Sequence, residues 1–148
     1  MSQDCGPTEW AQPEWGSLHG GGTATDTRTG LSWKQYATGL SGATCQTGSA
    51  HTFSWAQALA HAEVSTFANY TDWRLPSVKE LSSLVEDCRV LPAVNANLFP
   101  NTPSSYFWSG SPYASRANYA WFVAFDYGYA STDVWSLSHR VRLVRGGQ

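Results

Sequence analysis

The first region with helical spacing of apolar residues begins just after Ser54. Ser54 and Gln57 form a capping box of the S-x-x-Q type, in which each side chain satisfies a backbone N–H group that the first helical turn leaves free. Apolar residues then recur on one helical face. The pattern predicts a helix from about Trp55 to Val64.

The same signals recur some twenty residues later. Ser77 and Glu80 form a second capping box, and the apolar residues that follow are again at helical spacing. We expect this second helix to end near Asp87. No helical pattern follows it.

The remaining ordered segments have the patterns of strands. Thr23–Asp26 and Leu31–Lys34 flank a turn signal that ends at Gly30, which predicts a β-hairpin. Later, residues 121–126 alternate with the period of a strand. The uniformly apolar set is expected to face inward: Trp121, Val123 and Phe125. The other set is expected to face outward: Phe122, Ala124 and Asp126.

Less regular segments lie between and around these elements. Residues 1–22 are rich in Gly, Pro and Trp without periodicity and are interpreted as an irregular arm. Residues 37–51 are small and polar and are expected to form a loop. Residues 127–139 have no clean period and are expected to form an exposed, well-supported loop or ribbon, and 140–145 a last strand. Residues 23–148 would then be one α+β domain.

Composition limits the classes of partner. With 148 residues, 14% of them charged, and a formal net charge of −2, the chain has no basic footprint for nucleic acid or an anionic membrane. No apolar run is long enough to span a membrane. Residues 1–4 lack the pattern of a signal peptide, so either the protein is cytosolic or a leader is missing from this chain.

Candidate chemistry is sparse, and we expect neither an enzyme nor a cofactor. The four histidines lack metal-ligand spacing, and no serine-hydrolase or zinc-protease motif is present. The acidic clusters that would bind calcium are not visible. The cysteines are too widely spaced for a zinc site: Cys5, Cys45 and Cys88.

Aromatic and small residues dominate from about Tyr106 to His139. Between Cys88 and Gly147 there is no Glu, Gln, Lys or Met. Rigid aromatic rings among small polar residues are typical of antibody-like binding surfaces, because Tyr and Trp give large contact area at low entropic cost. A Trp-rich β core is the alternative interpretation of the same composition.

Several motifs in fixed order resemble the Lcl C-terminal domain family. They cover most of the chain after about residue 20: Thr25–Lys34, Asp72–Leu81, Phe99–Pro103, Phe107–Tyr113, Ala120–Trp121 and Val141–Gly147. The resemblance implies a C-type lectin-like fold, with two helices on a small, mostly antiparallel sheet with long loops. Family members are typically bacterial and surface-exposed, which implies a cell-surface or secreted location. We expect five residues to form the core of this scaffold and its polar bracing: Trp33, Trp73, Arg74, Trp108 and Trp121.

A subset of such domains is similar to the variable proteins of diversity-generating retroelements, in bacteria or their phages. There, mutated adenines turn AAY codons into NNY codons, which cannot encode Glu, Gln, Lys, Met or Trp. The resemblance places a variable region at about 106–142 and implies a protein or glycan as ligand. The implied ligand-binding positions are Ser115, Arg116, Ala117, Asn118, Tyr119, Phe122, Ala124, Asp126, Tyr127, Tyr129, Ala130, Ser131, Thr132, Asp133, Val134, Trp135, Ser136, Leu137, Ser138 and His139.

Within that set, affinity is expected to concentrate in a few aromatic anchors. These are Tyr119, Phe122, Tyr127, Tyr129 and Trp135. Trp135 is not NNY-encodable, so it would come from a mutated Lys or Arg codon or be fixed. Family members often carry a cysteine where Tyr36 stands, paired with one near Cys45. Here Cys45 is therefore free or pairs with Cys5 or Cys88.

Two other functions remain open at this stage. The first is an adhesin of fixed specificity for sulfated glycans, which would need a basic patch; its candidates are Arg140, Arg142 and Arg145. The second is an enzyme, because formylglycine-generating oxidases share the broad fold. Those enzymes use a pair of active-site cysteines, and this chain has no such motif.

Overall fold

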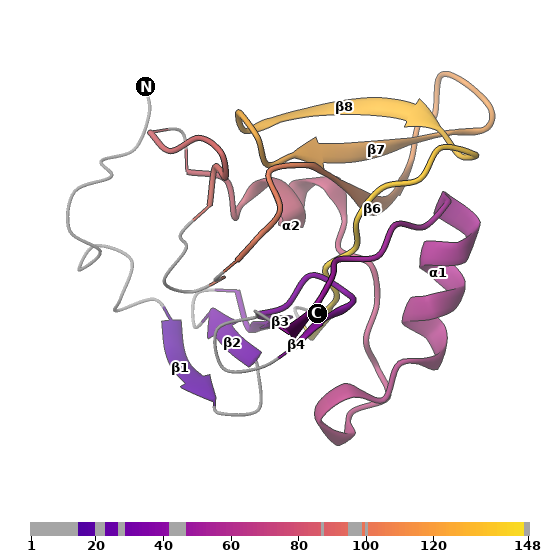
Figure 1. Ribbon diagram of the computed structural model, residues 1–148. Coiled ribbons are helices and arrows are strands. Elements are labelled where there is room, and N and C mark those ends of the chain that lie inside the picture. The colour runs from indigo at the N-terminus through magenta and orange to yellow at the C-terminus, as the bar shows by residue number, and fades with distance from the viewer. Residues whose placement is uncertain are drawn as a thin grey trace.

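A computed structural model describes residues 15–19, 23–26, 29–41, 47–86, 88–94, 99 and 101–146. A three-stranded sheet lies at one side of the molecule and a four-stranded sheet at the other, with α1 standing beside them and α2 against the three-stranded sheet (Figure 1). The fold is therefore α+β, as the sequence predicts.

The four-stranded sheet has the order β1-β2-β3-β9 and is antiparallel throughout. Its centre is the predicted hairpin, β2 (Thr23–Asp26) and β3 (Leu31–Lys34). Gly30 has φ 76°, a conformation that glycine adopts without strain, and its N–H donates to the carbonyl of Asp26 at 2.8 Å. The hairpin prediction is confirmed.

The strand β1 (Trp15–His19) corrects the expectation of an irregular arm over 1–22. It pairs with β2 with an irregularity between Trp15 and Ser17. The rest of that arm lies outside the described residues. The expected loop over 37–51 contains a pair of two-residue strands, β4 (Leu40–Ser41) and β5 (Thr47–Gly48).

Helix α1 (Trp55–Val64) has the predicted bounds, and both hydrogen bonds of its capping box are present. Helix α2 (Val78–Ser82) begins at the predicted cap, Ser77, but ends well before Asp87. Its last turn gives way to a bridge between Val85 and Val94, so the chain has already turned into an extended path. A 3-10 turn, η3 (Phe67–Asn69), lies between the two helices.

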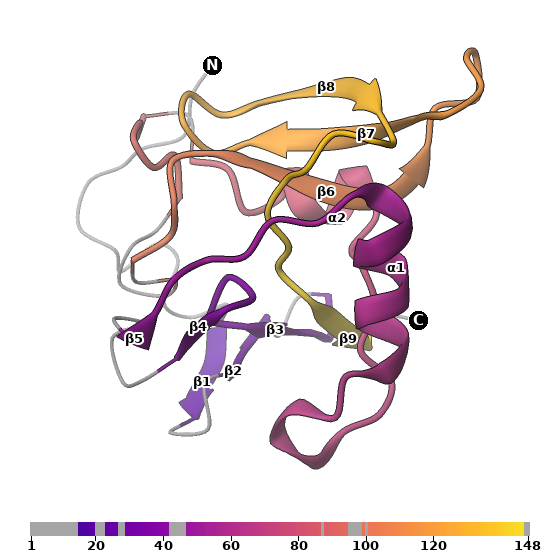
Figure 2. The ribbon, with the colours of Figure 1, turned by 45° about the vertical axis from the view of Figure 1, so that its right-hand side comes forward.

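The three-stranded sheet carries the aromatic stretch. It consists of β6 (Tyr106–Pro112), β7 (Tyr119–Ala124) and β8 (Tyr129–Val134), all antiparallel. The segment expected to be a loop or ribbon, 127–139, thus contains a regular strand over six of its thirteen residues. Only the end of the expected strand over 140–145 is a strand, β9 (Val144–Gly146). Residues 139–143, which we call the crossing segment, run extended from the three-stranded sheet to β9 in the other sheet (Figure 2).

Both faces of β7 are buried, which corrects the expected division into inward and outward residues. Val123 and Phe125 pack with Phe107 and the α2 residue Leu81 in one hydrophobic cluster. Phe122 and Ala124 lie on the opposite face, in a second cluster with Trp108 and the crossing segment. Trp121 is only half-buried. Its ring is nearly perpendicular to that of Tyr113, at 88°, with the ring centroids 5.5 Å apart.

Candidate ligand-binding surface

The structure places the predicted variable positions, residues 115–139, on the β7–β8 hairpin and the loops around it (Figure 1). Ten of them are exposed: Ser115, Arg116, Ala117, Asn118, Tyr127, Tyr129, Ala130, Ser136, Leu137 and Ser138. Seven are half-buried: Tyr119, Asp126, Ser131, Thr132, Asp133, Val134 and Trp135. We call the ten exposed residues the display surface.

The display surface has two parts, one at each end of the hairpin. The tip group follows the β7–β8 turn and consists of Tyr127, Tyr129 and Ala130. The loop group lies at the other end and consists of residues 115–118 and 136–138. A six-residue strand such as β7 separates its ends by roughly 17 Å. A ligand that contacts both groups must therefore extend over at least this distance.

Backbone hydrogen bonds hold the two loops of the loop group together. The N–H of Trp135 donates to the carbonyl of Asn118 at 2.8 Å, and the N–H of Trp55 donates to the carbonyl of Trp135 at 3.0 Å. The Arg116 guanidinium lies 4.3 Å above the centre of the Tyr119 ring. The loop group is thus tied both to the hairpin and to the N-terminus of α1.

Trp135 is a support for this region rather than an exposed anchor. Its ring stacks on that of Trp55, with centroids 4.9 Å apart and planes 24° apart. Its Nε1 is buried and has no hydrogen-bond acceptor among the described residues. A buried indole N–H without an acceptor costs stability, so the stacking must outweigh that cost.

The tip group rests on a tyrosine pair. The hydroxyls of Tyr106 and Tyr129 are 3.1 Å apart, and this hydrogen bond, followed by desolvation, raises the pKa of Tyr129 to about 12. At the turn itself, the Tyr127 N–H donates to the Asp126 carboxylate at 2.6 Å. Tyr127 is 62% exposed, the largest exposed fraction among the predicted aromatic anchors.

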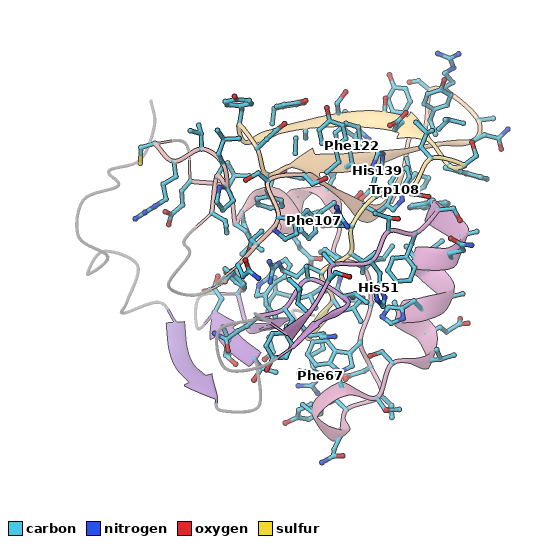
Figure 3. The ribbon with its side chains drawn as sticks, in the orientation of Figure 1. His51, Phe67, Phe107, Trp108, Phe122 and His139 are labelled. Carbon is cyan, nitrogen blue, oxygen red and sulfur yellow. The ribbon has the colours of Figure 1, made fainter. Side chains whose placement is uncertain are left out.

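Three of the predicted ligand-binding residues are buried, which corrects their expected exposure: Phe122, Ala124 and His139. Phe122 stacks on Tyr106 at 4.5 Å, and the His139 ring lies between Phe122 and Trp108 (Figure 3). The His139 imidazole also contacts the Asp133 carboxylate at 3.0 Å. We call Phe122, Ala124 and His139 the buried floor of β8. Their side chains are buried because the crossing segment covers this face of the sheet.

Two exposed apolar residues beside the tip group were not predicted as part of the site. Val90 and Leu91 are more than half exposed, and the Leu91 N–H donates to the Asp126 carbonyl at 2.7 Å. Leu91 has φ 51°, which is unusual for a leucine. The following Pro92 is the only local sequence signal, and it does not reveal this contact across the fold.

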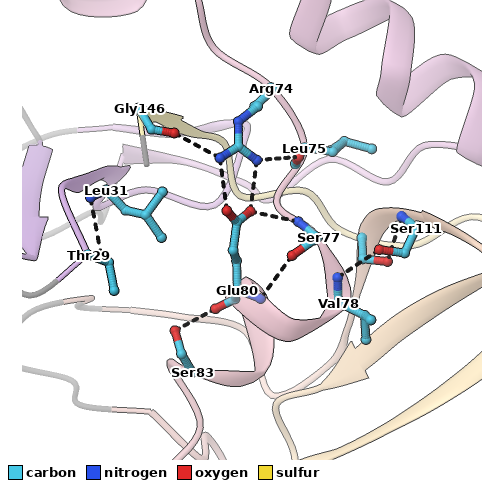
Figure 4. A network of polar contacts seen from close by, with 11 residues as sticks. Thr29, Leu31, Arg74, Leu75, Ser77, Val78, Glu80, Ser83, Ser111 and Gly146 are labelled. Carbon is cyan, nitrogen blue, oxygen red and sulfur yellow. Dashed lines mark hydrogen bonds and ion pairs between the residues drawn. The ribbon is translucent and has the colours of Figure 1, made fainter. Parts of the chain in front are cut away.

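Arg74 braces the scaffold, as the resemblance implies. Its guanidinium makes two hydrogen bonds to the Glu80 carboxylate, at 2.8 and 2.9 Å, and a third to the Gly146 carbonyl at 2.9 Å (Figure 4). The hydrogen bonding of Arg74 to the Glu80 carboxylate holds the pKa of Glu80 below its usual range. Of the predicted core tryptophans, Trp33, Trp73 and Trp108 are buried, whereas Trp121 is half-buried.

The arginines of the sulfated-glycan alternative do not form a basic patch. Arg142 is 1% exposed, and its guanidinium donates to the carbonyls of Lys34 and Gln35. Arg145 makes two hydrogen bonds to the Asp72 carboxylate, at 2.7 and 3.1 Å. Arg140 is half-buried in a separate cavity. The structure therefore gives this alternative no shared surface.

The part of the chain that the structure describes has neither a metal site nor a membrane-spanning helix. Among the described residues, no three His, Cys, Asp or Glu side chains are grouped so that they could hold a metal ion. No described helix is long and apolar enough to cross a bilayer. Cys88 is disulfide-bonded, and its partner lies outside the described residues.

The two helices and the small antiparallel sheets define a domain of the C-type lectin-like α+β class. Residues 22–145 match the family described as Lcl C-terminal domain, so the chain belongs to that family. No curated protein matches the chain. The membership is consistent with a ligand-binding or adhesin-like domain.

Proposed function

We propose that this domain is a non-enzymatic, receptor- or adhesin-type binding protein that presents a diversified surface on a fixed C-type lectin-like scaffold. The observation that carries the proposal is the contrast within the β7–β8 hairpin. Ten of the predicted variable positions, in this hairpin and in the loops beside it, are exposed, while β7 is buried on both faces. Such a backbone tolerates changes in what it displays because its own packing does not depend on those side chains.

The composition of the same segment supports an origin in a diversity-generating retroelement. All ten residues of the display surface are of types that NNY codons encode, and Glu, Gln, Lys and Met are missing from residue 89 to residue 146. Trp135 departs from the codon rule, and its ring is stacked on Trp55. We therefore propose that Trp135 is a fixed support and that the display surface carries the diversity.

The ligand on this proposal is a protein or glycan, since an extended chain or a broad surface reaches from the tip group to the loop group. Affinity is proposed to concentrate in Tyr127 and Tyr129, the exposed aromatic anchors. We also propose a cell-surface or secreted location. The disulfide at Cys88 supports it, because disulfides persist in oxidising compartments.

The retroelement origin is tested by sequencing the DNA that flanks the gene. We expect a nearby template repeat, beside a reverse-transcriptase gene, that differs from the coding sequence at adenines. The differences should be concentrated in the codons of the display surface and rare in the codons of the buried strand. A locus without such a repeat would refute the origin, while leaving ligand binding by a fixed surface to be tested separately.

A further inference from the structure

A mostly apolar cavity lies beside helix α1, where the helix meets residues 51–53. Its volume is about 590 Å³. The helical residues that line it lie on one face of α1, because they are spaced at i, i+3, i+4 and i+7. The described lining residues are His51, Thr52 and Phe53 from the segment before the helix, and Gln57, Ala60, His61 and Val64 from α1. None of them belongs to the display surface.

Three of the lining side chains are rings, and they contact one another through Phe53. The His61 ring lies 5.1 Å from that of Phe53, with the planes 31° apart. The His51 ring lies 6.4 Å from that of Phe53, with the planes 52° apart, and His51 stands beside α1 (Figure 3). Phe53 is only half-buried, so part of its ring is open to the cavity. A further aromatic ring packs well against such a group, in an offset or edge-on arrangement.

Backbone hydrogen bonds hold this group of rings in place. The Phe53 N–H donates to the carbonyl of His139 at 2.8 Å, and the Phe53 carbonyl accepts from the N–H of His139 at 2.9 Å. The same carbonyl accepts from Nε1 of Trp108 at 2.8 Å. The His51 N–H donates to the carbonyl of Thr38 at 2.8 Å. The cavity is therefore formed before a ligand arrives, which keeps the entropic cost of binding low.

The lining contains no residue with a permanent charge, since no Asp, Glu, Lys or Arg is among the described lining residues. Burial, followed by the electrostatic effects of Lys34 and His51, lowers the pKa of His61. Its ring therefore stays neutral at neutral pH. Nε2 of His61 is closed off from solvent, so this residue contributes ring surface and not that nitrogen. A charged ligand would lose its hydration here and meet no opposite charge on the lining residues.

Few polar groups are available to a ligand in this cavity. His51 and Thr52 are exposed, and their side chains can donate or accept a hydrogen bond. Oε1 of Gln57 already accepts from the Ser54 N–H at 2.9 Å in the capping box of α1. A sugar would exchange many hydrogen bonds with water for few with the protein, which is unfavourable. The lining instead suits a ring with one polar group.

We propose that this cavity is a binding site for a small, uncharged aromatic molecule that carries a single polar group. The ring packs against Phe53, and the polar group reaches His51 or Thr52. The volume lies within the roughly 300–1,000 Å³ that is usual for small-molecule sites. The site shares no residue with the display surface, so it stands or fails whatever the outcome for diversification.

The test is an NMR titration of ¹⁵N-labelled protein with phenol. We expect saturable shifts of the amides of residues 51–53 and 60–61. The dissociation constant should be on the order of 1 mM, because phenol has few atoms with which to gain binding energy.

Three further probes each test one part of the proposal. Cyclohexanol has the size and the hydroxyl of phenol without the aromatic ring, so it should bind about three- to tenfold more weakly. Sodium benzoate, at constant ionic strength, adds a charge to the same ring. Methyl glucoside is an uncharged sugar. Neither of these two should give saturable shifts of the amides that respond to phenol.

Three variants make the outcome specific. Ala60→Trp fills the cavity from an exposed position of α1 and should abolish phenol binding. Its matched control is Leu59→Trp, which adds the same ring at an exposed helix position that does not line the cavity, and which should keep phenol binding. Phe53→Leu keeps an apolar side chain and removes the ring, so phenol and cyclohexanol should then bind about equally.

The proposal would be overturned by phenol shifts that rise linearly and never saturate. It would equally be overturned if cyclohexanol, benzoate or methyl glucoside binds as tightly as phenol, or if phenol binding is unchanged in Ala60→Trp. If Ala60→Trp does not fold, Phe53→Leu decides the matter: a preference for phenol over cyclohexanol equal to that of the unaltered protein would refute the assignment.

Discussion

Replacing Phe122 by alanine tests whether this predicted ligand-binding residue is part of the buried floor or of the display surface. Phe122 is one of the predicted ligand-binding positions, yet it is only 5% exposed and stacks on Tyr106 at 4.5 Å. Its ring also lies 5.3 Å from that of His139. The substitution removes this packing and leaves a cavity between the sheet and the crossing segment.

The magnitude follows from burial. Truncation of a buried Phe to Ala costs about 3–5 kcal/mol, part of which comes from the cavity that remains. For a domain of this size each kcal/mol lowers Tm by about 2–4 °C, so a fall of about 6–20 °C is expected. The matched control is Tyr127→Ala, whose side chain is 62% exposed and whose loss should change stability by no more than about 0.5 kcal/mol.

The assay is urea unfolding followed by tryptophan fluorescence, with Tm from calorimetry as a second reading. If the free energy of unfolding falls with urea concentration at the same slope in both variants and in the unaltered protein, the difference in free energy is a difference in folded-state stability. If Phe122→Ala lowers the free energy of unfolding by less than about 1 kcal/mol, Phe122 is not buried as described, because truncation of a buried Phe costs more than that. A Tyr127→Ala variant as unstable as Phe122→Ala would contradict the division between the buried floor and the display surface.

Three further predictions concern other parts of the structure. Trp135→Phe keeps the ring stack and removes the unsatisfied N–H, so it should cost under about 1 kcal/mol in urea unfolding, whereas Trp135→Ala should cost about 1–3. The hydrogen bonds from Arg74 lower the pKa of Glu80 in the folded state below its unfolded value of about 4.3. The stabilisation from this pair is therefore present above that value and is lost as pH falls through the folded pKa. Glu80→Gln should reduce the loss of unfolding free energy at acid pH, and an unchanged pH dependence would contradict the pair. In ultraviolet titration Tyr129 should ionise near pH 12, and Tyr106→Phe should return the pKa of Tyr129 toward its ordinary value; a Tyr129 pKa that stays near 12 in Tyr106→Phe would contradict the hydroxyl pair.

The elements that the sequence predicts correctly are those with local signals. Helix α1 carries its cap and its apolar face within eleven residues, and the β2–β3 hairpin carries its turn glycine between two short strands. Each can be recognised without knowing what packs against it. The start of α2 at Ser77 is equally local, because the capping box itself defines it.

The parts that were wrong depend on distant segments. The short length of α2 reflects the bridge between Val85 and Val94, and β1 is a strand because it pairs with β2. Neither pairing has a signature within its own residues.

The prediction of which β7 side chains face inward was wrong for the same reason. Period-2 alternation shows that a strand has two faces, and the apolar face is placed inward when only one face is covered. Here α2 covers one face and the crossing segment covers the other, so Phe122 and Ala124 are as buried as Val123. Three of the predicted ligand-binding residues, Phe122, Ala124 and His139, are therefore buried rather than exposed.

The central claim is that the display surface can change its chemistry, and so its ligand, without loss of the fold. It is tested most directly by a phage-displayed library in which NNY codons replace the ten codons of that surface. A control library randomises five exposed positions on α1: Ala56, Leu59, Ala60, Glu63 and Val64. Both libraries are first sorted for resistance to protease and then selected on the same immobilised protein, such as an antibody Fc fragment.

We expect most display-surface variants to survive the protease and to yield specific binders, with aromatic residues enriched at 127 and 129. The control library should also fold but give few binders, because its five positions on one helix offer a smaller surface than the ten positions of the display surface. Binders recovered equally from both libraries, or a display-surface library that mostly fails to fold, would contradict the claim.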